Sequence, residues 1–176
     1  MISRPRQPGK KVVTLFLESA FLADIRASDV KLRAGVVAAA IDVLEMNGFS
    51  CEVVAVGCNK CGGDPGWQLV TTLKKAGERF NLNDMVFAIG HPSYFRRFAF
   101  AAMSFDEDQR QYWRGRGAAC KSFNAYHLPK ANEFVIEQFR GKYLDRSAPL
   151  IDQARQCWDI IIPKNFPITL TGETEE

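Results

Sequence analysis

Residues 12–56 decide the fold, and they have the sequence VVTLFLESAFLADIRASDVKLRAGVVAAAIDVLEMNGFSCEVVAV. The run Val12 to Leu17 is apolar and rich in strand-forming residues without alternation, which is typical of a strand covered on both faces. Residues 29–47 carry apolar side chains at helical spacing, and residues 50–56 predict a second strand. Strand, helix and strand form a βαβ unit with parallel strands and a right-handed crossover.

The ends of the predicted helix are marked by its flanking residues. Ser28 can cap the first turn, Asp29 favours the positive helix end, and Gly48 suits the left-handed turn that closes a helix. We expect one face to be buried and the other to be exposed: the buried set is Leu32, Val36, Ala40 and Leu44, and the exposed set is Lys31, Asp42 and Glu45.

The pattern beyond residue 56 is weaker. Gly-rich residues 57–67 predict a loop, and the weak alternation of residues 68–74 with its terminal lysines suits an edge strand. Residues 81–89 fit a helix or a strand, and the favoured interpretation is a helix capped near Asn83 and Asp84 and ended by Gly90, His91 and Pro92. Ser93 begins another helix. The remaining expected elements are helices at 131–145 and 148–156 and a buried strand at 158–162 beside the first two strands.

Length and composition predict one globular domain. The chain has 176 residues, of which 47% are hydrophobic and 24% charged, and its net charge of +3 permits an acidic partner without demanding one. We expect a flexible basic arm at 1–11, a single α/β domain at 12–165 and an acidic tail at 166–176.

Several patterns predict a cytoplasmic protein. No apolar run approaches the ~18 residues that cross a membrane, so no membrane partner is expected. The basic start runs into Pro5, Pro8 and Gly9, which predicts no signal peptide. The five cysteines are an odd number without an extracellular spacing pattern, which favours thiols or metal ligands over disulfides.

Two parts of the chain resemble a known family. The first contains Val12 through Ser19, the triplet Arg33-Ala34-Gly35, and Leu44 through Val56; the second contains HPSYFRRF at 91–98 and the run 159–163. Together they are similar to an uncharacterised domain family encoded by bacteriophages and related mobile elements, which itself resembles von Willebrand factor A domains. The resemblance implies a three-layer, Rossmann-like α/β fold with a mostly parallel sheet, helices on both faces and a central first strand.

The resemblance also directs attention to the loop after the first strand. A von Willebrand A domain binds a divalent metal there through an Asp-x-Ser-x-Ser loop, whereas this chain has LESAF at 17–21, without the Asp and the second Ser. Glu18 and Ser19 remain candidate ligands, although Mg²⁺ requires several oxygens in octahedral array. The alternative is a loop that only connects strand and helix.

Cys58 and Cys61, followed by two glycines, have the spacing of a zinc knuckle. Zinc takes four ligands, and Cys120 and His127 are the candidates to complete the set. A redox motif is less favoured, because the Gly- and Pro-containing residues 62–66 do not readily start the helix that lowers a thiol pKa. The third interpretation is two unligated thiols in a turn.

Two further segments carry candidate binding residues. His91, Ser93 and Arg96 could hold a phosphate at a helix N-terminus; the favoured alternative is that His91 and Ser93 only cap helices. Residues 109–126 mix aromatic rings with cations, which suits nucleic acid or a protein partner alike; the interaction candidates there are Arg110, Tyr112, Trp113, Arg114, Arg116 and Lys121.

No complete catalytic motif is present: the sequence contains no P-loop, no dinucleotide fingerprint, no His-Glu-x-x-His and no Gly-x-Ser-x-Gly. The sequence therefore predicts a non-enzymatic binding or assembly module with a protein partner, and the resemblance implies a phage-type system. The alternatives are a nucleic-acid-associated protein that uses the basic arm and residues 109–126, and a zinc-binding protein or enzyme. We expect the site above the carboxyl ends of the strands, at loops 18–28 and 57–67.

Overall fold

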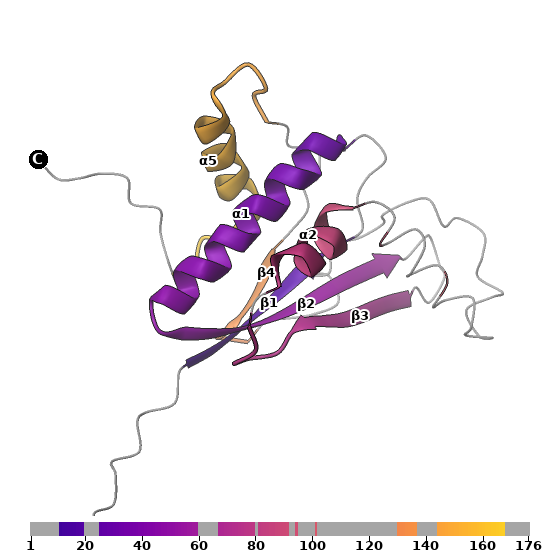
Figure 1. Cartoon of the computed structure of the whole chain (residues 1–176), viewed down its shortest axis with the longest axis vertical. Helices are drawn as coiled ribbons and strands as arrows, with labels where there is room; N and C mark the ends of the chain where they lie inside the picture. Colours follow the sequence, from indigo (N-terminus) through magenta and orange to yellow (C-terminus); the bar gives the residue numbers. More distant parts are fainter. Residues whose placement is uncertain are drawn as a thin grey trace, which may run out of the picture.

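The strand β1 (Lys11–Glu18) lies inside a four-stranded sheet of order β3-β2-β1-β4 (Figure 1). The computed structural model describes residues 11–19, 25–59, 67–79, 81–91, 94, 101, 130–136 and 144–167. The other elements within them are α1 (Ala27–Met46), β2 (Phe49–Asn59), β3 (Trp67–Lys74), α2 (Leu82–Gly90), β4 (Glu133–Ile136) and α5 (Leu150–Ile161).

The sheet is mixed. β1 pairs in parallel with β2, where Val13 lies opposite Cys51, and in parallel with β4, where Leu15 lies opposite Phe134. β3 runs antiparallel along β2, with a register shift between Val53 and Val54. The predicted βαβ unit and the predicted edge strand are confirmed, and the fold is α/β.

The helix α1 follows the predicted pattern with three differences. Its N-cap is Arg26 without a side-chain cap, because Ser28 donates its hydroxyl to Asp29 instead; the predicted Ser28 cap is therefore wrong. Gly48 has a positive φ of 84°, as predicted for the residue that closes the helix. Of the expected buried face Val36, Ala40 and Leu44 are buried, while Leu32 is only half-buried. Of the expected exposed face Lys31 and Asp42 are exposed, while Glu45 is half-buried.

Two predicted elements are wrong. Residues 131–145 were expected to be helical, but they contain the strand β4, whose four residues are too few to show a period of two. Residues 158–162 were expected to be a strand, but α5 extends through Ile161. The apolar run at 160–162 fits a strand as well as a helix. The side chains that α5 buries are Cys157, Trp158 and Ile161. The loop at 57–67 is also shorter than expected, since β2 continues to Asn59.

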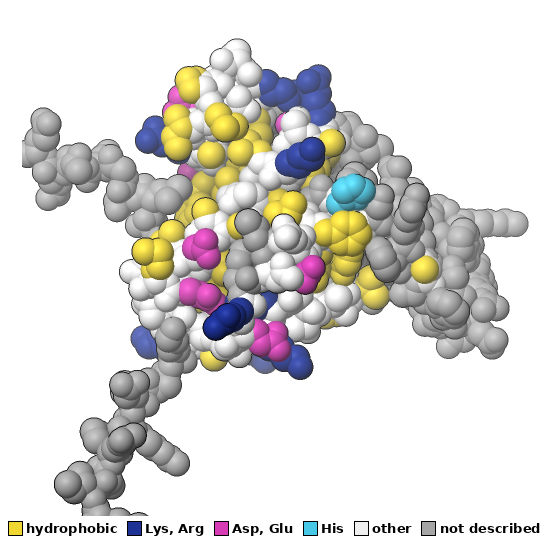
Figure 2. Space-filling model, in the orientation of Figure 1, with side chains coloured by type: hydrophobic (Ala, Val, Ile, Leu, Met, Phe, Trp, Pro, Cys, Tyr) yellow, Lys and Arg dark blue, Asp and Glu magenta, His cyan; other side chains and the backbone are white. Residues whose placement is uncertain are grey.

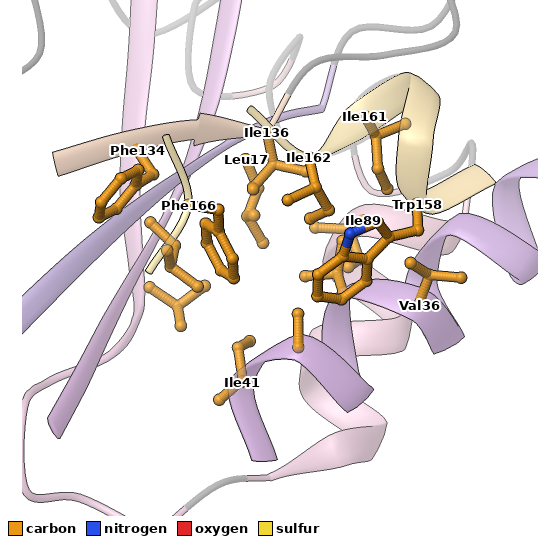
Figure 3. Packing of buried hydrophobic residues seen from close by; sticks show 14 of the residues in the cluster. Leu17, Val36, Ile41, Ile89, Phe134, Ile136, Trp158, Ile161, Ile162 and Phe166 are labelled. Atoms are coloured by element: carbon orange, nitrogen blue, oxygen red, sulfur yellow. The ribbon is translucent and has the colours of Figure 1, made fainter. Parts of the chain in front are cut away.

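The helices α1, α2 and α5 lie on one face of the sheet, where the main core forms (Figures 1 and 3). Leu17 of β1, Ile41 of α1, Ile89 of α2 and Trp158 of α5 meet there. Phe166 closes the core by packing its ring edge-on against Phe134 and Trp158, at centroid distances of 5.3 and 5.9 Å. A smaller cluster covers the other face and contains Phe16, Val54, Val56 and Val135. Helices on both faces, the three-layer arrangement, stay a prediction.

Candidate functional site

The carboxyl ends of the parallel strands β2, β1 and β4 meet at one edge of the sheet. From β1 the chain continues to β2 on one side, whereas β4 lies on the other side, so the strand order reverses between β1 and β4. Ligands of open α/β sheets bind at such a switch point, outside the carboxyl ends of the strands. Glu18 and Ile136, the last residues of β1 and β4, mark this position.

A buried charge pair lies at the switch point. Arg33 of α1 is fully buried, and its Nη2 donates to the carbonyl oxygen of Ile136 at 2.9 Å. Burial lowers the pKa of Arg33 to about 10, and the charge of the nearby Glu18 carboxylate opposes this shift. Glu18 is itself only 4% exposed. The guanidinium is therefore protonated at neutral pH, and its charge is balanced locally rather than by solvent.

Ser19 is fixed to the neighbouring strand. Its backbone N–H and its hydroxyl both donate to the carbonyl oxygen of Val56, at 2.9 and 3.1 Å. These bonds anchor the chain where it leaves β1 and commit the hydroxyl proton to the backbone. The structure thus brings the candidates Glu18 and Ser19 together at the strand end, with Ser19 in a structural contact.

An ion pair lies on the first turn of α1. Arg146 donates to both carboxylate oxygens of Asp29, from Nη2 at 2.6 Å and from Nε at 3.4 Å. Asp29 is 6% exposed, so solvent screens this pair less than an open surface pair. The pair ties the segment that leads into α5 to the start of α1, and so fixes the approach of the two helices.

His91 lies at the end of α2. It is the C-cap residue of that helix, which agrees with the interpretation of His91 as a helix-ending residue. Its exposed ring stacks on Phe87 at 5.5 Å, and Tyr94 meets Phe87 edge-on at 5.9 Å. The other members of the proposed phosphate site, Ser93 and Arg96, lie outside the described residues.

The predicted metal ligands cannot be placed together. Cys61, Cys120 and His127 lie outside the described residues, as does the side chain of Cys58. Among the described residues no group of three or more His, Cys, Asp and Glu side chains is placed to hold a metal ion. The interaction candidates at 109–126 also lie outside the described part of the chain.

An apolar groove of about 590 Å³ opens between α1 and α5. Its walls are mainly aliphatic: Leu32, Val36 and Ala39 come from α1, and Leu150, Ile151 and Ala154 from α5. Leu150 and Ile151 are 71% and 61% exposed. Figure 2 shows hydrophobic side chains gathered between these helices, with cationic side chains near them. In the part of the chain that the structure describes, no helix is both long and apolar enough to cross a membrane.

The sequence contained signals for the features that were missed. Arg33 lies on the buried side of α1, one residue before Ala34 and four before Val37, and a charge at such a position must be compensated inside the fold. Asp29 was interpreted only as a helix-start residue, because its partner Arg146 is 117 positions away. The pattern at 148–156 predicts a helix, but it does not show that Leu150 and Ile151 lie on its exposed side.

A search of curated proteins and a search of solved structures each found no match to the chain. A family model matches residues 1–156, which is most of the 176 residues. The chain therefore belongs to the family described as "Domain of unknown function (DUF7192)".

Proposed function

We propose that the protein is a non-enzymatic binding or assembly module that docks a protein partner on the groove between α1 and α5. The observation that carries the proposal is the high exposure of Leu150 and Ile151 beside an apolar groove. Isolated exposed apolar residues are ordinary, but apolar side chains that gather at a hollow surface are typical of interaction sites.

An ion pair and a buried hydrogen bond of α1 support this function indirectly. Arg146 and Asp29 hold the segment before α5 against α1, and Arg33 holds α1 to the end of β4. Both walls of the groove are therefore fixed before a partner arrives. A preformed surface loses less conformational entropy on binding, which favours affinity.

The fold class and the biological system of the module also belong to the proposal. We assign the module to the three-layer, von Willebrand A-like and Rossmann-like class, and to a phage-type system in the bacterial cytoplasm. The central position of β1 and the parallel βαβ unit support the fold assignment. The sequence resemblance supports the setting. The alternative nucleic-acid partner relies on residues outside the described part of the chain.

A photo-crosslinking residue in place of Ile151 tests the proposal in the native source of the protein. Position 70 is the control, because Val70 is 55% exposed and lies on β3, away from the groove. We expect protein adducts of defined mass from position 151 and none of that mass from position 70. Equal adducts at both positions, or adducts that nuclease removes, contradict a protein partner at the groove.

A further inference from the structure

We infer that the partner at the α1–α5 groove is a second copy of this chain, related to the first by a twofold axis. The inference rests on the proposed function, since it names the partner of the same surface. It is carried by the exposed side chains of α1 and by their charges, which are arranged to match a second, antiparallel α1.

One side of α1 faces solvent along its length. The exposed residues on it include Lys31, Gly35, Ala39 and Asp42. Lys31 and Asp42 are eleven residues apart, which is close to three turns, so they lie on the same side of the helix and ~16 Å apart along its axis. Between them a Cβ added at Gly35 would meet nothing within 4 Å. A second helix can therefore approach the middle of α1 closely.

The charges at the two ends of this stretch are opposite. If two copies of α1 pair antiparallel about an axis near residue 37, Lys31 of each copy lies opposite Asp42 of the other. One kind of contact is then made twice, as an isologous interface requires. Neither side chain forms an ion pair with any other residue that the structure describes.

The apolar groove supplies the rest of the contact. With the twofold axis perpendicular to α1, the α5 helices of both copies lie on the same side, so Leu150 and Ile151 of each copy cover the groove of the other. The 20-residue α1 is ~30 Å long and the 12-residue α5 is ~18 Å long, and each is ~10 Å wide, which gives a face on the order of 500 Å². Specific interfaces bury about 800 Å² per partner, so this is a reversible dimer.

Charge reversal tests the pairing in the purified chain by sedimentation velocity at low ionic strength. We expect concentration-dependent dimers of the native chain. Lys31→Asp or Asp42→Lys alone turns both attractive contacts into repulsive ones, and each variant should dimerise about tenfold more weakly. Mixed in equal amounts, the two variants should associate with each other about as well as the native chain, because each then supplies the charge that the other needs.

Lys75→Asp is the matched control, since Lys75 is exposed and lies beyond β3, away from the groove. It should leave dimerisation unchanged, and thermal melts should show that all variants fold. A chain that stays monomeric at every concentration overturns the inference, although protein adducts from position 151 would still support the proposed function. A dimer that neither single reversal weakens, or a mixture of variants that does not recover, also overturns it.

Discussion

Cys51 and Cys157 show at the scale of single residues how burial controls chemistry. Both are free thiols within the described chain and are fully buried. Burial raises the pKa of Cys51 from 9.0 to about 11 and that of Cys157 to about 12. Both thiols are therefore protonated at neutral pH, and neither has the lowered pKa of a reactive cysteine.

The raised pKa values predict that stability falls in alkali. In the unfolded chain Cys51 loses its proton near pH 9, whereas in the fold it keeps the proton to about pH 11. Its contribution is complete below pH 9 and is lost between pH 9 and 11, at up to about 1.4 kcal/mol per pH unit. Urea unfolding at pH 8 and pH 10 measures this. Cys51→Ala should lose less stability between the two pH values than the native chain, and an equal loss would contradict the assignment.

At the scale of elements, Lys74 departs from the pattern expected of an edge strand. The terminal lysines of β3 suggested an exposed edge, yet the Lys74 side chain is only 3% exposed. The register shift between Val53 and Val54 lies opposite the end of β3 and changes the direction of the strand there. The Lys74 ammonium lies 2.7 Å from the Glu45 carboxylate and donates to the Cys51 carbonyl oxygen at 2.9 Å. Lys74 thus joins β3 to α1 and β2.

Removing the Lys74 ammonium should leave the buried Cys51 carbonyl oxygen and the half-buried Glu45 carboxylate without this donor. We expect Lys74→Ala to lower the free energy of unfolding by about 2 kcal/mol, the cost of leaving a buried acceptor unsatisfied. The neighbouring exposed lysine provides the comparison, and Lys75→Ala should change stability by less than about 0.5 kcal/mol. Urea denaturation of both variants measures the difference. Equal stabilities would show that the Lys74 contacts contribute nothing.

Elements that depend on local sequence could be predicted, whereas elements that depend on distant contacts could not. The βαβ unit was predictable because long apolar periodicity and Gly48 agreed over residues 12–56. β4 was not, because its four residues form a strand only through pairing with β1, a contact more than a hundred residues distant. The prediction of a strand at 158–162 was wrong for a different reason, since an apolar run of this length fits a buried helix as well as a strand.

The residues of the candidate site also differ in whether the sequence alone could identify them. Glu18 was a candidate because the family resemblance directs attention to the loop at the end of the first strand. Arg33 was missed as a site residue because its role depends on Ile136, which folding brings within 2.9 Å. The groove requires the relative positions of two helices, which local sequence does not encode.

At the scale of the whole molecule, the core extends beyond the family match. The match ends at residue 156, inside α5. The buried residues after it are Cys157, Trp158, Ile161, Ile162 and Phe166. Loss of one large buried side chain costs about 3–5 kcal/mol, whereas a whole domain has only about 5–15 kcal/mol of net stability. The segment 157–166 therefore belongs to the cooperative unit, although it lies outside the matched range.

Two truncated chains test this conclusion. A chain of residues 1–167 keeps every described residue and should unfold in urea with the same midpoint and cooperativity as the full chain. A chain of residues 1–156 loses the buried half of α5 and the ring of Phe166, which packs on Phe134 and Trp158. It should show no cooperative transition by circular dichroism. If the shorter chain unfolded at the native midpoint, the packing of α5 on α1 would contribute nothing to stability. The groove between those helices could then not be a fixed surface.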